Sequence, residues 1–242
     1  MEATRRSVLS GVGAALASPA IATASGRSPP IAWSETPAFA DSPLAANTAA
    51  RRFVAPAGHA VWPEELELLG PGGPQSIAAW RGKTMLVALW AEWCAPCLAE
   101  MPALARLNRS YRNPRFEIAP IVTGSKTLHS VADAQSRLAA LPGADIDTLL
   151  DASPDGGALM HALANSPPPP GFKAPPGATV ISATLPCLLV VDPAGRLRGR
   201  ALGGSGPGER NLWDMPGGEA FIKRLADGAV GGELAAPTRT TA

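Results

Sequence analysis

Two apolar runs of seven residues, with a helix-like stretch between them, dominate the hydrophobic pattern of the chain. The runs TMLVALW (residues 84–90) and FEIAPIV (residues 116–122) are almost continuous, which is typical of strands buried on both faces of a sheet. Between them, apolar side chains recur at near-helical spacing from Leu98 to Leu107, and Asn113 and Pro114 end that pattern. The pattern predicts a strand, a helix that begins at about residue 94, and a second strand.

Strand and helix patterns continue to alternate after these elements, which favours an α/β fold. The turn Asp192-Pro193-Ala194-Gly195 carries proline and glycine where a β-turn prefers them, so an antiparallel hairpin is expected around it. The further predicted elements are a helical turn over 75–81, a helix over 130–141, a strand over 146–151, a helix over 157–165, strands over 185–191 and 195–202, and a helix over 218–228.

The remaining segments lack such periodicity. Residues 25–60 are rich in Ala, Pro, Ser and Thr, and we expect a flexible linker there, with one folded domain over residues 61–229. The proline-rich stretch SPPPPGFKAPPG (residues 166–177) predicts a surface excursion, because proline neither continues a helix nor pairs inside a sheet. A disordered tail is expected over residues 230–242.

The N-terminus has the features of an export signal. Arg5 and Arg6 precede a mildly apolar stretch, and the order T-R-R-x-V-L resembles the twin-arginine pattern. Ala22-Thr23-Ala24 offers a small-x-small cleavage site, so residues 1–24 are expected to be a signal peptide and the mature protein to be periplasmic. An uncleaved anchor is the alternative, and membrane contact is expected only in that case. The stretch falls short of the roughly 20 strongly apolar residues that a span needs.

Composition and charge narrow the range of partners. The chain has 242 residues, of which 46% are hydrophobic and 17% charged, which suits one well-filled core. Its formal net charge is +1 and no run of Lys and Arg occurs beyond the N-terminus, so the electrostatic footprint of nucleic-acid binding is absent. Small molecules or proteins are therefore the expected partners.

The stretch WAEWCAPC places two of the three cysteines, Cys94 and Cys97, at the predicted junction of strand and helix. A zinc site is disfavoured, because the chain has no second cysteine pair and its three histidines are scattered. A permanent structural disulfide would close too small a loop to constrain the unfolded chain much. A redox pair is favoured, because a helix N-terminus stabilises a thiolate; we expect Cys94 to be exposed there and Cys97 to lie one turn inward.

These residues resemble the thioredoxin superfamily, and in finer detail its exported TlpA/ResA-like branch, which includes cytochrome c maturation reductases. The resemblance covers roughly residues 61–228. It rests on RGK before the first strand, WCAPC, the following LAEMP, DASPDGGALMHALA, and the later LPCLLVVDPAG. It implies a thioredoxin-like fold with a central mixed sheet flanked by helices, and a thiol-disulfide oxidoreductase that needs no cofactor or metal.

The resemblance also implies roles for individual residues. Cys94 would be the attacking thiolate and Cys97 the resolving thiol of a redox disulfide. Pro186 matches the family's cis-proline, and Leu185 before it would pair with the backbone of a bound substrate. Glu100 matches a carboxylate that acts near the cysteines as a proton acceptor or tunes their potential. Its alternative role is that of a solvated carboxylate that suits the helix dipole.

Four other positions bear on these expected roles. Typical thioredoxins carry a buried aspartate where this chain has Ala88, which makes Glu100 the better candidate for the proton acceptor. Trp93 is interpreted as a substrate-facing aromatic, with simple packing as the alternative, and Glu92 as a surface residue. Cys187 is expected to be a buried, inert thiol; the alternative is a third redox thiol near the active pair.

The direction of electron flow is inferred from the residues between the cysteines. Ala95 and Pro96 carry no charge that would favour a thiolate, so a reducing potential is expected. The expected partners are oxidised thiols of extracytoplasmic proteins, of the cytochrome c or copper-site assembly type, and an upstream extracytoplasmic electron donor. Alternatives are a copper-binding chaperone that uses Cys94, Cys97 and Met101, and a disulfide oxidant or isomerase.

Overall fold

The computed structural model describes residues 30–63, 66–166, 182–204 and 211–230. The expected signal peptide, the tail beyond Val230 and nearly all of the proline-rich excursion lie outside these residues. In the part of the chain that is described, no helix has both the length and the apolar character needed to cross a membrane.

A mixed sheet forms the centre of the structure, as expected, with the strand order β1-β2-β11-β10-β5-β6-β7-β3-β4. The strand β5 (Thr84–Trp90) is buried along its whole length. It pairs parallel with β6 (Phe116–Val122) and antiparallel with β10 (Cys187–Val191). The strand β7 (Leu149–Asp151) extends the parallel part beside β6, and β11 (Leu197–Leu202) forms the predicted hairpin with β10. The apolar runs of the sequence are therefore the central strands.

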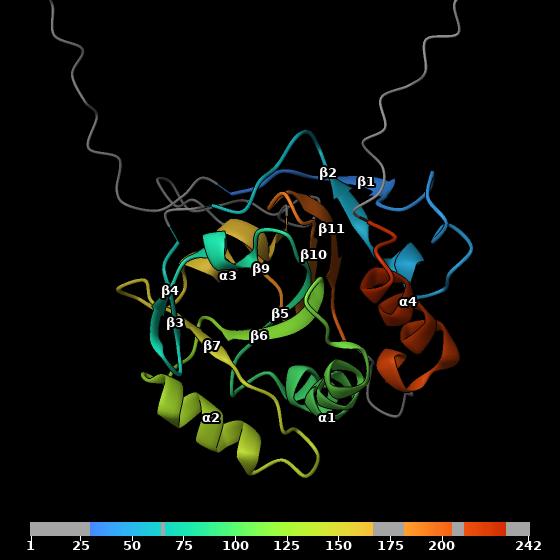
Figure 1. The fold of residues 1–242 in the computed structure, drawn as a ribbon. Coiled ribbons are helices and arrows are strands. Elements are labelled where there is room, and N and C mark those ends of the chain that lie inside the picture. The colour runs from blue at the N-terminus through green and yellow to red at the C-terminus, as the bar shows by residue number, and fades with distance from the viewer. Residues whose placement is uncertain (1–29, 64–65, 167–181, 205–210, 231–242) are drawn as a thin grey trace, which may run out of the picture.

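Alternate side chains of β5 enter two separate cores, one on each face of the sheet. Leu86, Ala88 and Trp90 belong to the core that contains α1 (Ala95–Tyr111), α2 (Val131–Ala139) and α4 (Pro216–Ala226). Met85, Val87 and Leu89 belong to the core under α3 (Ala158–Leu163) and the short 3-10 helix η2 (Ile77–Trp80). Figure 1 shows α1 and α3 on opposite sides of β5 and β6. Successive side chains of β5 thus point to opposite faces of the sheet, as expected for a strand that is buried on both faces.

The segment before residue 61 differs from the expected linker. Residues 30–60 contain β1 (Trp33–Pro37), the 3-10 helix η1 (Ala50–Arg52) and β2 (Val54–Pro56), and β2 pairs with β11. Phe53 is fully buried, with its ring centroid 5.1 Å from that of Phe221 in α4. The folded unit therefore begins upstream of Val61. Composition alone pointed to a linker because the partners of this segment lie far away along the chain.

Several short elements were not predicted. They are β3 (Leu68–Gly70) and β4 (Gly73–Gln75) at one sheet edge, the small pair β8 (Asn165–Ser166) and β9 (Ser182–Ala183), and the 3-10 helix η3 (Leu212–Asp214). Each has two or three residues, too few to show a hydrophobic period. Of these, η3 matters for the site because it packs against α1.

Candidate active site

The two cysteines lie where β5 gives way to α1. Cys94 is the N-cap residue of α1, and its sulfur accepts the backbone N–H of Cys97 at 3.3 Å. The two sulfurs are bonded at 2.02 Å, with the Cα atoms 5.3 Å apart. An N–H group of the first helical turn that points at a sulfur stabilises a thiolate there when the disulfide is reduced.

The expected exposure of Cys94 is not observed. Cys94 is 3% exposed and Cys97 1%, and both side chains belong to the core on the α1 face. Cys94 is covered because it caps the helix with its side chain turned towards Cys97, so the oxidised pair sits just below the surface. A protein partner must therefore reach a disulfide whose two side chains are almost fully buried.

The peptide bond between Leu185 and Pro186 is cis, the isomer that the resemblance implied. The carbonyl of Pro186 accepts the backbone N–H of Gly203 at 2.9 Å, which joins this loop to the end of β11. A Cβ atom placed on Gly204 would lie 2.9 Å from Cβ of Pro96 and 3.0 Å from Cγ of Pro186. The cis-proline loop and the residues between the cysteines thus meet at one point.

Glu100 lies one turn after Cys97 on α1 and is only 3% exposed. Burial raises the pKa of its carboxyl group from 4.5 to about 7. Two weaker influences lower the pKa: the indole of Trp213 and the charge of Arg52. The Trp213 contact is loose, because its Nε1 atom has no partner at hydrogen-bond distance. Glu100 is therefore not a solvated surface carboxylate but a buried group that can gain or lose a proton near neutral pH.

Sequence reasoning missed the surroundings of Glu100. Oε1 of Glu100 would lie 3.2 Å from a Cβ on Gly204, Trp213 comes from η3, and Arg52 comes from the N-terminal segment. The pair Gly203-Gly204 after a strand was a usable signal, since glycine there often marks a close backbone approach. Trp213 and Arg52 had no local signal, because they reach the site only through the tertiary fold.

Glu92 and Trp93 directly precede Cys94 in the sequence. Trp93 is 45% exposed, and its indole N–H donates to the carbonyl of Gly124 at 2.8 Å. Glu92 accepts hydrogen bonds from the Ser125 hydroxyl and from the backbone N–H of Lys126. Partial burial raises the pKa of Glu92, but these hydrogen bonds outweigh it and the pKa is lowered overall. Glu92 thus stabilises the loop after β6. The same loop contains Gly124, which accepts the hydrogen bond of the Trp93 indole.

Cys187 points away from the disulfide. It belongs to the core on the α3 face, whereas Cys94 and Cys97 belong to the core on the α1 face. Cys187 is fully buried, and burial raises the pKa of its thiol to about 12, against a smaller opposing effect of Arg200. The alternative of a third redox thiol beside the active pair is therefore contradicted, because the sheet separates the sulfurs.

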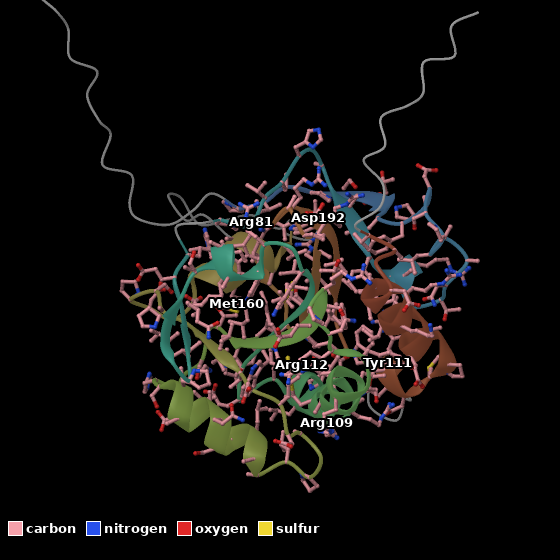
Figure 2. All side chains as sticks on the ribbon, in the orientation of Figure 1. Arg81, Arg109, Tyr111, Arg112, Met160 and Asp192 are labelled. Atoms are coloured by element: carbon pink, nitrogen blue, oxygen red, sulfur yellow. A yellow bond between two sulfur atoms is a disulfide. The ribbon has the colours of Figure 1, made fainter. Side chains whose placement is uncertain are left out.

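A hollow of about 390 Å³ lies at the other end of α1 and is lined in part by Arg109 and Arg112, whose side chains are labelled in Figure 2. Both arginines have partners there: Arg109 donates to the backbone carbonyl of Asp145, and Arg112 lies 3.9 Å from Glu117. The disulfide is at the N-terminal end of the same helix, so the hollow takes no part in the redox chemistry. Among the described residues, no group of three or more His, Cys, Asp or Glu side chains is placed to hold a metal ion.

A disulfide between two cysteines at a helix N-terminus, close to a cis-proline, is the arrangement that performs thiol-disulfide exchange in thioredoxin-like folds. The chain is accordingly a thioredoxin-like thiol-disulfide oxidoreductase. It belongs to the Redoxin family, whose model matches residues 45–210. The family match begins within the N-terminal segment that we had expected to be a linker.

Comparisons with individual proteins give more distant similarities. The chain is 34% identical over 55 residues to the thioredoxin-like protein YneN of Bacillus subtilis, an alignment that covers 23% of this chain and 32% of YneN. One solved structure with a similar fold is that of a thiol:disulfide interchange protein of Chlorobium tepidum. It is 19% identical, with a TM-score of 0.47, and the alignment covers 72% of this chain and 99% of that one. Another is the exposed lipoprotein thioredoxin of Streptococcus pneumoniae, at 20% identity and a TM-score of 0.45, over 66% and 97%.

Proposed function

We propose that this protein is exported and reduces disulfides of extracytoplasmic proteins, of the kind that mature cytochrome c or assemble copper sites. The observation that carries this proposal is the uncharged spacer Ala95-Pro96 between two cysteines that form a disulfide. Without a positive charge between the cysteines, the reduced form lacks the additional charge stabilisation of strong oxidants, so the pair tends to give electrons away. An upstream extracytoplasmic donor would then restore the dithiol.

The proposed reaction uses the side chains of Cys94, Cys97 and Glu100. The thiolate of Cys94 attacks a substrate disulfide, a mixed disulfide forms, and one substrate sulfur leaves as a thiolate that takes up a proton. The thiol of Cys97 gives its proton to the carboxylate of Glu100 and attacks the sulfur of Cys94. The second substrate sulfur leaves, the Cys94–Cys97 disulfide closes, and two electrons have passed to the substrate. Glu100 suits this role because i and i+3 positions share one face of a helix, and because its pKa is about 7.

Substrate binding is assigned to the rim of this site. The exposed ring of Trp93 offers an apolar surface beside the cysteines, and it is held in place by its hydrogen bond to Gly124. On the other side, the backbone of Leu185 before the cis-proline would pair with an extended segment of the partner. A substrate disulfide would thus contact the Trp93 ring and the backbone of Leu185.

The midpoint potential of the Cys94/Cys97 couple tests the direction of electron flow. We expect a value below about −200 mV, on the reducing side of the protein disulfide isomerase range. In the reduced protein, Cys94 should alkylate much faster than Cys97, because only Cys94 caps the helix N-terminus. A potential near −120 mV, typical of a strong oxidant, would reject the reductase proposal.

Export is tested separately with a reporter fused behind residues 1–60. The reporter should leave the cytoplasm, and replacing both Arg5 and Arg6 with lysine should retain it there, since the twin-arginine route requires the arginine pair. Export of the double-lysine variant would favour the general secretory route, while a cytoplasmic parent fusion would contradict export altogether.

A further inference from the structure

A short chain of hydrogen bonds links the N-terminal segment to the cis-proline loop. Nη2 of Arg52, the last residue of η1, donates to the carbonyl of Gly203 at 3.1 Å. On its other side, the N–H of Gly203 donates to the carbonyl of Pro186 at 2.9 Å. Gly203 is therefore held from both directions, by Arg52 and by the cis-proline loop beside the disulfide.

The next residue, Gly204, closes over Glu100. A Cβ atom on Gly204 would approach Oε1 of Glu100 to 3.2 Å, in addition to its closer approaches to Pro96 and Pro186. The backbone at Gly204 thus forms one wall of the pocket that holds the carboxylate. Any group that fixes Gly203 also fixes this wall, because the two residues share a peptide unit.

Arg52 is also the cation that acts on this carboxylate. In the described part of the chain, the charged side chain that lowers the pKa of Glu100 is Arg52. Arg106, on the same helix as Glu100, is engaged elsewhere, because it pairs with Asp214 at 3.0 Å. The disulfide of Cys94 and Cys97 is uncharged. Among the described residues, Glu100 therefore has one favourable charge to offset its burial, and that charge is exposed.

We propose that Arg52 is a positioning residue for the dithiol reaction, which holds the Gly203-Gly204 backbone over Glu100 and favours the ionised state of that carboxylate. The effect on reaction rate rests on the proton-accepting role proposed for Glu100, whereas the effect on Glu100 itself does not. Because only the ionised carboxylate accepts the Cys97 proton, loss of Arg52 lowers the fraction of molecules ready to react at neutral pH.

The test compares Arg52→Gln with Arg51→Gln in the full-length protein. Arg51 is the neighbouring exposed arginine of η1, so both variants lose one charge from the same short helix. Two quantities are measured across pH: the titration of Glu100, followed by carboxyl carbon-13 NMR of the oxidised protein, and the rate at which Cys97 resolves a mixed disulfide on Cys94.

We expect Arg52→Gln to move the Glu100 titration to higher pH, and Arg51→Gln to move it less. Arg52→Lys should restore most of the effect, because it keeps the charge at this position. The pH profile of the resolving step should shift upward in the same order. In a Glu100→Gln background, Arg52→Gln should no longer alter the pH profile, since the group on which it acts is gone.

Equal Glu100 titrations in Arg52→Gln and Arg51→Gln would overturn the proposal, even if Arg52→Gln unfolded at a lower temperature, because a purely structural contact would do the same. A shifted Glu100 titration with an unchanged rate profile has a different meaning. That outcome would support the coupling between Arg52 and Glu100 and would reject the proton-accepting role of Glu100. The two failures are thus distinguishable.

Discussion

At the residue scale, the ionisation of Glu100 links the redox site to the stability of the whole protein. The carboxyl is buried, so the folded state binds its proton more tightly than the unfolded state does, with a pKa of about 7 in place of 4.5. Stability from this group is complete below pH 4.5 and is lost as the pH rises through about 7. Burial of this carboxyl group therefore lowers the stability of the protein at neutral pH.

We therefore predict that the free energy of unfolding falls between pH 5 and pH 8 by up to about 3 kcal/mol more in the parent protein than in Glu100→Gln. The glutamine keeps the shape of the side chain and has no charge to bury. Urea unfolding of the oxidised proteins at both pH values measures the difference. If the two proteins show parallel pH dependence, the carboxyl is not buried in the way the structure describes.

Cys187, unlike Glu100, is a buried titratable group that we expect to take no part in the redox reaction. Its thiol is fully buried, and its pKa of about 12 leaves it protonated at any working pH. We predict that Cys187→Ala leaves the midpoint potential and the exchange rate unchanged, and that it costs about 1–2 kcal/mol of stability through lost packing. Alkylation of the native reduced protein should modify Cys94 and Cys97, and reach Cys187 only in denaturant. Fast native alkylation of Cys187 would contradict this assignment.

At the element scale, the end of β11 is shaped by its closeness to α1 and the cis-proline loop. Gly204 leaves no room for a side chain, since a Cβ would come within 2.9 Å of Pro96 and 3.0 Å of Pro186. We predict that Gly204→Ala slows exchange with a protein disulfide by about tenfold or more, because a displacement of this size misplaces reacting groups.

Gly72→Ala is the matched control, because a Cβ at Gly72 would contact nothing within 4 Å. Exchange rates of both variants are measured with the same protein substrate, and thermal midpoints are recorded to show that each variant is folded. A folded Gly204→Ala that reacts at the parent rate would contradict this prediction, because it would show that the backbone at Gly204 can shift without misplacing the reacting groups.

The elements that could be predicted from the sequence are those whose burial is visible locally. The strands β5 and β6 were predicted with their observed bounds, because a continuous apolar run of this length is typical of a strand buried on both faces. The helix α1 was predicted from its apolar period and the residues that end it. The strands β1 and β2 were not predicted, since WSETP and VAP show no alternation and owe their order to β11.

The candidate site divides in the same way. The disulfide pair and the cis-proline could be predicted from the sequence because each lies in a short, specific motif. The burial of Cys94 was not predicted, because it depends on how the side chain caps α1. The neighbours of Glu100 come from residues 52, 204 and 213, and no local pattern brings such distant positions together.

At the scale of the whole molecule, the N-terminal segment acts as part of the domain. Phe39 and Phe53 are buried, and their rings lie 5.7 and 5.1 Å from that of Phe221 in α4. Asn47 adds a polar tie, since its side-chain amide donates to the carbonyl of Gly217 at 3.0 Å. The same segment carries Arg52, so its docking supports both the core and the surroundings of Glu100.

We predict that Phe53→Ala lowers the free energy of unfolding by about 3–5 kcal/mol, the range for removal of a buried aromatic ring. Thr36→Ala, an exposed change in β1, should stay within about 0.5 kcal/mol of the parent. Urea unfolding should show one transition in all three proteins, because η1 and α4 share a core. If the segment were a linker, Phe53→Ala would unfold at the same urea concentration as Thr36→Ala, and the docking of residues 30–60 would be refuted.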